Sequence, residues 1–189
     1  MKNKNSVQNL TLSAMMIAMG LVLPMITGQM QAVGNMLLPM HLPVFLAGLL
    51  CGWQYGLLTG LIVPLLRSVL FGMPPLYPVA IAMMFELAVY GAVSGFLYER
   101  SPWKCVIAVY KALIAAMIAG RIVWGIAEVI LLSLNGKAFT MQAFLAGAFL
   151  NAIPGIVIQL IIIPAIMVAL NRAGLVKFGK KGSAEHAAV

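Results

Sequence analysis

The sequence predicts an all-α integral membrane protein, a bundle of six transmembrane helices with both termini in the cytoplasm. Of its 189 residues, 63% are hydrophobic and only 8% are charged, whereas a soluble domain carries roughly 25% charged residues. A transmembrane helix needs about 20 apolar residues, and long apolar runs follow one another at 10–33, 36–66, 69–98, 105–134 and 138–170. We therefore expect a cytoplasmic leader over 1–9, a six-helix transmembrane domain over 10–171 and a basic polar cytoplasmic tail over 172–189.

The first apolar run is too long, and too clearly followed by others of its kind, to be a cleaved signal peptide. It contains "AMMIA", Ala14 to Ala18, a small-xxx-small pattern that lets a second helix approach closely. That helix can belong to this chain or to a partner protein, and the pattern alone leaves both possibilities open.

The second run contains "GLLCGWQYGLLTG", with glycines at 48, 52, 56 and 60. It predicts either one long helix with a small-residue stripe or two short helices that turn near 52–56. Charge favours two helices, because six spans put eight of nine flanking basic residues on the cytoplasmic side, as the positive-inside rule requires. These eight are Lys2, Lys4, Arg100, Lys104, Arg172, Lys177, Lys180 and Lys181, with Lys137 left outside. A re-entrant hairpin over 41–71 would also leave both termini on the same side of the membrane, and it remains an alternative.

Local signals mark the later boundaries. "GMPPLYP", Gly72 to Pro78, cannot continue a helix and predicts a rigid outer loop before the fourth helix. Ser101-Pro102 resembles an N-cap followed by a proline at the first helical position, and so predicts the start of the fifth helix. "LNGKAFT" predicts the outer turn before the sixth helix, and the polar tail after 172 is expected to be mostly disordered.

Few ionisable residues lie deep in the predicted spans. Lys111 is close enough to the inner surface to snorkel, but four others are not: Arg67, Glu86, Arg121 and Glu128. At about 1.5 Å per residue, Glu86, Arg121 and Asn151 fall within a few Å of one plane, and Arg67 and Glu128 form a second layer nearer the outer surface. A charge at the bilayer centre costs about 2.5–3.5 kcal/mol even on lenient scales, so these residues need partners or a ligand.

Two hypotheses explain this polar layer. Salt bridges Glu86–Arg121 and Arg67–Glu128 could simply fix helix packing. Alternatively the residues line a pocket that opens outward, in which an arginine holds an anionic group and Trp124 and Tyr90 cover apolar parts of the ligand. The spacing of polar residues favours the second hypothesis. Tyr90 follows Glu86 by four residues, so both lie on one face of the fourth helix. The sixth helix repeats small or polar residues at 143, 147, 151, 155 and 159, which gives it a polar face that can point into the bundle. His41 is either at the rim of such a pocket or an ordinary interfacial histidine.

The sequence offers no chemistry typical of an enzyme. It has no aspartate and no G-x-x-x-x-G-K-[ST], H-E-x-x-H or G-x-S-x-G motif, so we expect neither ATP hydrolysis by this chain nor a bound metal or cofactor. The net charge of +8 comes from residues at the ends and in one loop, which argues against a nucleic-acid surface. The two cysteines, Cys51 and Cys105, lack metal-site spacing and are expected to pack as small apolar residues.

With six short-to-medium spans, AxxxA in the first helix, "LLPMHLPVFLAGLLCGWQYGLLTGL" and "FGMPPLYPVAIAMMFELAVYGAVSGFLYER", the chain resembles the substrate-binding S components of energy-coupling factor (ECF) transporters. The resemblance covers nearly the whole chain and is most specific between Met36 and Arg100. It implies a subunit in the plasma membrane of a prokaryote that binds a small vitamin from outside. It also implies that Ala14 and Ala18 dock onto a transmembrane coupling protein that carries two ATPases.

The pattern "FGMPP…FEL…YG" is most similar to the pantothenate branch of that family, whose substrate carboxylate would suit Arg121 or Arg67. The nearby glutamates leave a neutral, hydroxyl-rich or cationic vitamin open. An alternative function is that of a stand-alone carrier or channel, which would use Glu86 and Glu128 as proton sites.

Overall fold

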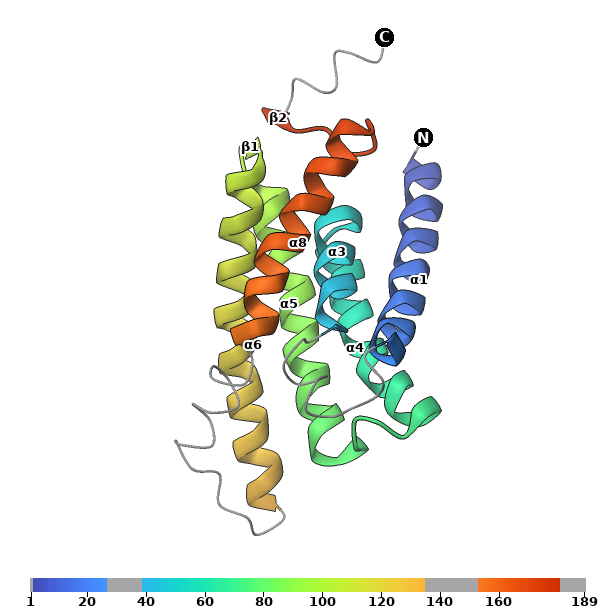
Figure 1. Ribbon diagram of the computed structural model, residues 1–189, viewed down its shortest axis with the longest axis vertical. Helices are drawn as coiled ribbons and strands as arrows, with labels where there is room; N and C mark the ends of the chain where they lie inside the picture. The colour runs from blue at the N-terminus through green and yellow to red at the C-terminus, as the bar shows by residue number, and fades with distance from the viewer. Residues whose placement is uncertain (1, 27–38, 135–152, 181–189) are drawn as a thin grey trace.

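The computed structural model describes residues 2–26, 39–134 and 153–180, and within these ranges it is almost entirely helical (Figure 1). Its helices are α1 (Lys2–Ile26), α3 (His41–Cys51), α4 (Trp53–Phe71), α5 (Ile81–Arg100), α6 (Val106–Leu134) and α8 (Ile153–Arg172). A short π-helical turn, η1 (Leu76–Ala80), leads into α5. Two-residue strands, β1 (Trp103–Lys104) and β2 (Gly179–Lys180), pair antiparallel.

The helices run alternately up and down the long axis of the bundle, so the start of α1 and the end of α8 lie at the same end (Figure 1). Five of them are long and apolar enough to cross a membrane, and α3 is the exception with 11 residues. At 1.5 Å per residue α3 is about 16 Å long, roughly half the apolar thickness of a bilayer. The predicted all-helical membrane architecture is thus confirmed, while a sixth full span and the cytoplasmic position of the termini stay predictions.

The second apolar run forms two helices that reverse direction at one residue. Gly52 has φ +105° and ψ 166°, a conformation open essentially to glycine alone. A Cβ placed on Gly56 would lie 2.6 Å from Gly48 Cα, whereas residues eight apart in one straight helix are about 12 Å apart. Of the two interpretations of the glycine pattern, a helical hairpin is therefore the one that the chain adopts.

Two other boundaries differ from expectation. The helix predicted to open at Ser101-Pro102 begins at Val106, because Trp103 and Lys104 pair with the chain's C-terminal strand and Ser101 Oγ donates a hydrogen bond to Trp103 O (2.8 Å). The described part of the predicted tail contains the strand β2, and its Phe178 amide donates a hydrogen bond to Asn171 Oδ1 (2.9 Å). The predicted outer turn after Leu134 lies outside the described residues.

Glycines bring α3, α4 and α5 into backbone contact. A Cβ on Gly91 of α5 would lie 2.2 Å from Gly56 O, one on Gly48 would lie 2.4 Å from Gly91 O, and one on Gly60 would lie 2.3 Å from Leu87 O. Around these contacts the apolar core is fully buried, with Phe45, Leu87, Leu113 and Ile163 each at 0% exposure. The core therefore lies between α3, α5, α6 and α8, and α4 closes one side of it.

Replacing Gly91 by alanine should destabilise the bundle, because the added carbon meets backbone atoms of α4 that cannot rotate away. Overpacking of this kind costs about 1–3 kcal/mol. We expect a lower midpoint in thermal unfolding of the purified protein in detergent. The control is Gly72→Asn, where a Cβ meets nothing within 4 Å and asparagine tolerates the local φ of +69°. Equal loss in both variants would contradict the close-contact explanation.

Candidate functional site

Four buried polar side chains from three helices meet in the interior of the bundle. His41 is the first residue of α3, Glu86 and Tyr90 lie one turn apart on α5, and Arg121 lies in the middle of α6. Their exposed fractions are 1%, 2%, 2% and 6%, respectively. We call these four residues the Glu86 cluster. Because α3 runs from His41 to the Gly52 turn, the cluster lies about 16 Å from that turn.

One carboxylate oxygen holds the Glu86 cluster together. Glu86 Oε1 accepts a hydrogen bond from the Tyr90 hydroxyl (2.7 Å) and lies 3.1 Å from Arg121 Nη1. His41 Nε2 lies 3.8 Å from the same oxygen, within ion-pair range if the imidazole is protonated. A single negative charge thus has a hydrogen-bond donor on α5 and a cation on α6, with an imidazole of α3 nearby, which offsets much of the cost of burying it.

Aromatic and small residues fix the position of Tyr90. Its ring stacks on Phe45 (centroids 4.9 Å apart, planes at 21°) and contacts the His41 ring (5.3 Å, 52°). On the α6 side a Cβ on Gly120 would lie 2.2 Å from the Tyr90 ring. Phe45 was not among the predicted site residues, although the four-residue spacing from His41 places both on one face of α3.

The guanidinium of Arg121 is only partly used. Its Nη1 faces Glu86, but Nε and Nη2 are buried and have no hydrogen-bond partner among the described residues. An unpaired buried donor costs about 1–3 kcal/mol, and more when it is charged. Two such donors side by side on a planar group match the geometry of a carboxylate or phosphate, which binds both at once.

The second predicted pair, Arg67–Glu128, is absent, so the hypothesis of two structural salt bridges is wrong for that pair. Arg67 Nη1 instead donates to Leu21 O of α1 (2.8 Å), and the guanidinium lies 5.4 Å from the centre of the Phe71 ring. Arg67 thereby joins α4 to α1 just before Pro24, the proline inside α1. Glu128 is buried at 6% exposure on α6, two turns beyond Arg121.

The remaining predicted site residues are less well placed. Trp124 is half-buried on α6, and Asn151 lies outside the described residues. The predicted stripe on the last helix is visible in α8, where Gly155 and Gln159 are buried and the stripe continues through Ile163 and Met167. Gln159, at 2% exposure, belonged to that stripe but not to the predicted site. Four-residue spacing was the signal that could have added it.

The predicted docking residues lie on an open surface. Ala14 and Ala18 are exposed on α1, among exposed methionines and aliphatic residues such as Met15, Met19 and Val22. An apolar groove of about 880 Å³ lies beside them, bounded by α1, α3, α8 and residues 174–176. Across the residues that the structure describes, no group of three His, Cys, Asp or Glu side chains could hold a metal ion.

Comparison with known proteins identifies a family that the chain matches. A family model described as "ECF transporter, substrate-specific component" matches residues 8–167, which is most of the chain. Searches of the curated proteins and of the solved structures gave no match.

The Glu86–Arg121 contact predicts a specific pattern of stability. Arg121→Met leaves the Glu86 carboxylate buried without its cation, and breaking a buried pair in this way costs about 3–5 kcal/mol. Adding Glu86→Gln to Arg121→Met should restore much of that loss, because no uncompensated charge then remains. Thermal or denaturant unfolding of the ligand-free protein measures this double-mutant cycle. If the loss of unfolding free energy in the double variant equals the sum of the losses in the two single variants, the two residues do not stabilise each other.

Proposed function

The chain belongs to the family of ECF transporter substrate-specific components, and from that premise we propose which residues bind the substrate and which meet the partner. Members of this family are substrate-binding subunits of importers, not enzymes, and this chain is accordingly a multi-pass membrane protein that binds a small molecule and docks to an ECF module. The substrate we propose is a vitamin that is captured outside a prokaryotic cell, with pantothenate favoured.

We propose that the substrate binds at the Glu86 cluster, and the single observation that supports this is the half-used guanidinium of Arg121. A ligand that carries a carboxylate can accept from Nε and Nη2 together and so supply what the protein lacks there. Trp124 is half-buried three residues after Arg121 on α6, and we propose that it covers apolar parts of the ligand. Pantothenate combines such a carboxylate with hydroxyl and amide groups, which suits a cluster that also contains a carboxylate and an imidazole.

The direction of entry follows from charge. The described basic residues Arg100, Lys104, Arg172 and Lys177 gather at the end of the bundle that holds β1 and β2. If the positive-inside rule puts that end in the cytoplasm, the Glu86 cluster lies toward the opposite, external side.

For the partner, we propose that the coupling protein of the ECF module packs a helix on the α1 face that carries Ala14 and Ala18. Two small exposed residues four apart let a second helix approach the α1 backbone closely. The neighbouring groove is lined by Met15, Met16 and Met19, and methionine side chains adapt to different partners because they are flexible and polarisable. Two ATPase subunits of the module would supply the energy that this chain lacks.

Substrate binding can be tested without ATP. We expect one compound in a panel of B vitamins and precursors, pantothenate first, to raise the unfolding temperature of the purified chain, since a ligand stabilises the state it binds. Arg121→Ala should weaken that ligand about 10- to 100-fold, the effect of losing hydrogen bonds to a charged group.

The matched control is Arg67→Met, which removes a buried arginine that contacts α1 and not the Glu86 cluster. Its affinity should stay within about threefold of the wild-type value, less than 1 kcal/mol. Unchanged affinity in Arg121→Ala would exclude Arg121 from the site, and equal losses in both variants would point to a general effect on folding.

If α1 is the docking surface, a substitution there should block transport without changing the affinity for the ligand. Ala14→Leu should leave ligand affinity unchanged but abolish ATP-driven uptake in vesicles that contain the whole ECF module, because the larger side chain keeps the partner helix away from α1. Ala14→Ser keeps a small residue and should transport normally. Uptake that survives in Ala14→Leu would refute the docking role. Flux driven by a proton gradient through the chain alone would favour the stand-alone carrier instead.

A further inference from the structure

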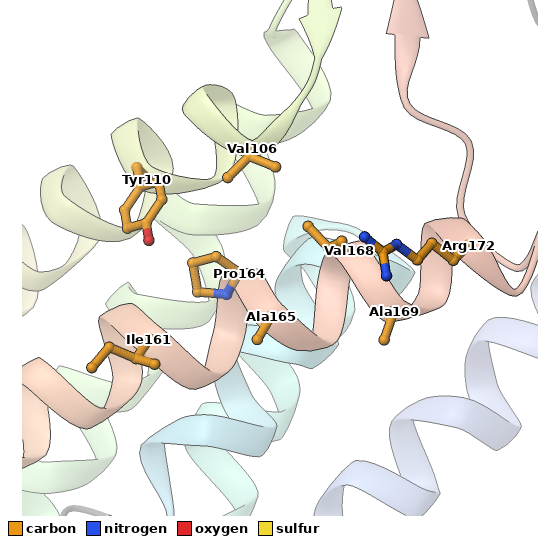
Figure 2. A pocket seen from close by; sticks show the side chains of 8 residues that line it. All are labelled: Val106, Tyr110, Ile161, Pro164, Ala165, Val168, Ala169 and Arg172. Carbon is orange, nitrogen blue, oxygen red and sulfur yellow. The ribbon is translucent and has the colours of Figure 1, made fainter.

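A second groove lies between α6 and α8, at the end of the bundle away from the Glu86 cluster and sharing no residue with it (Figure 2). Its volume is about 480 Å³. The residues that line it are Val106, Tyr110, Ile161, Pro164, Ala165, Val168, Ala169 and Arg172. All of them belong to helices that are long and apolar enough to cross a membrane, so we expect lipid to reach the groove.

The groove is mostly apolar, and small residues form part of its wall on α8. Ala165 and Ala169 lie one turn apart on α8 and are exposed, so α8 presents a shallow surface there. From Ile161 to Arg172 the groove follows α8 for about 16 Å, comparable to one leaflet of the apolar bilayer core. In hydrocarbon such a channel is filled by an alkyl chain, because an empty apolar hollow forfeits dispersion contacts along its walls.

The groove ends in polar groups. Arg172 is the last residue of α8, and its side chain turns back along the helix toward Val168, so that the guanidinium lies at the mouth of the groove (Figure 2). The Tyr110 hydroxyl points from α6 toward α8 in the same view. Lys104 and Lys177 lie at the same end of the bundle. Apolar walls that lead to a cation at the membrane surface are the pattern of a phospholipid site.

We propose that this α6–α8 groove binds one anionic glycerophospholipid, with an acyl chain along Ala165 and Ala169 and the headgroup phosphate on Arg172. Charge complementarity selects this occupant: a helix of another protein would place apolar side chains on the guanidinium, whereas a phospholipid brings an anion to the same end as the cation. Arginine binds phosphate through two parallel N–H groups, which the exposed end of the Arg172 side chain can offer.

The test measures lipids that stay bound to the protein. The full chain is reconstituted in nanodiscs of equal phosphatidylglycerol and phosphatidylcholine, extracted in mild detergent, and analysed by native mass spectrometry. We expect phosphatidylglycerol to be enriched about fivefold among retained lipids, the factor for one basic residue beside an anionic lipid. Arg172→Gln should abolish the enrichment, and Ala165→Leu should reduce retention of both lipids by filling the groove.

Arg100→Gln is the matched control, since Arg100 ends α5 at the same side but stacks on Phe96 (4.9 Å) and does not line the groove. It should retain wild-type enrichment. Equal retention of the two lipids by the wild type, or equal loss in Arg100→Gln and Arg172→Gln, overturns the proposal. So does a dimer that disappears in Ala165→Leu while lipid retention persists, because the groove would then hold a second copy. Arg172 is exposed at a helix end, so its variant should fold even if Ala165→Leu does not.

Discussion

The burial of one carboxylate, Glu86, constrains the rest of the bundle. A charge this deep costs several kcal/mol unless polar or cationic groups surround it, and here such groups come from α3, α5 and α6, all facing the same oxygen. The three helices must therefore keep a fixed register, since a shift of one turn would move a donor by about 5.4 Å. Apolar packing alone would tolerate such shifts far better, so the cluster specifies the arrangement more than it stabilises it.

The glycines make that register possible. Gly91 and Gly48 allow α5 to touch the α3–α4 hairpin at backbone distance, and Gly120 makes room for the Tyr90 ring beside α6. With larger residues at these positions the helices would stand farther apart, and the Tyr90 hydroxyl and Arg121 would no longer converge on Glu86. The glycine pattern and the buried charges, which look like separate features in the sequence, are thus two parts of one packing solution.

Features that depend on the spacing of apolar and charged residues could be predicted from the sequence. Contacts could not be predicted where the partner is a backbone group or a segment far away in the sequence. Helical spans and the Glu86–Arg121 contact follow from apolar runs and from depth along each helix. The hypothesis that pairs Arg67 with Glu128 rests on their charges and similar depth, but the acceptor for Arg67 is the Leu21 carbonyl, which no side-chain pattern reveals. Likewise α6 starts at Val106 because residues 103–104 pair with 179–180, which lie far away in the sequence.

The last helix connects the two ends of the molecule. One face of α8, with Gly155, Gln159, Ile163 and Met167, is buried against the core, and a neighbouring face, with Ala165 and Ala169, lines the groove at the basic end. Pro164 lies between them and removes a backbone hydrogen bond at that level. A helix weakened there can bend without breaking the Glu86 cluster, because none of the four residues of the cluster belongs to α8. The α6–α8 groove, which we propose meets lipid, thus shares no residue with the buried charges.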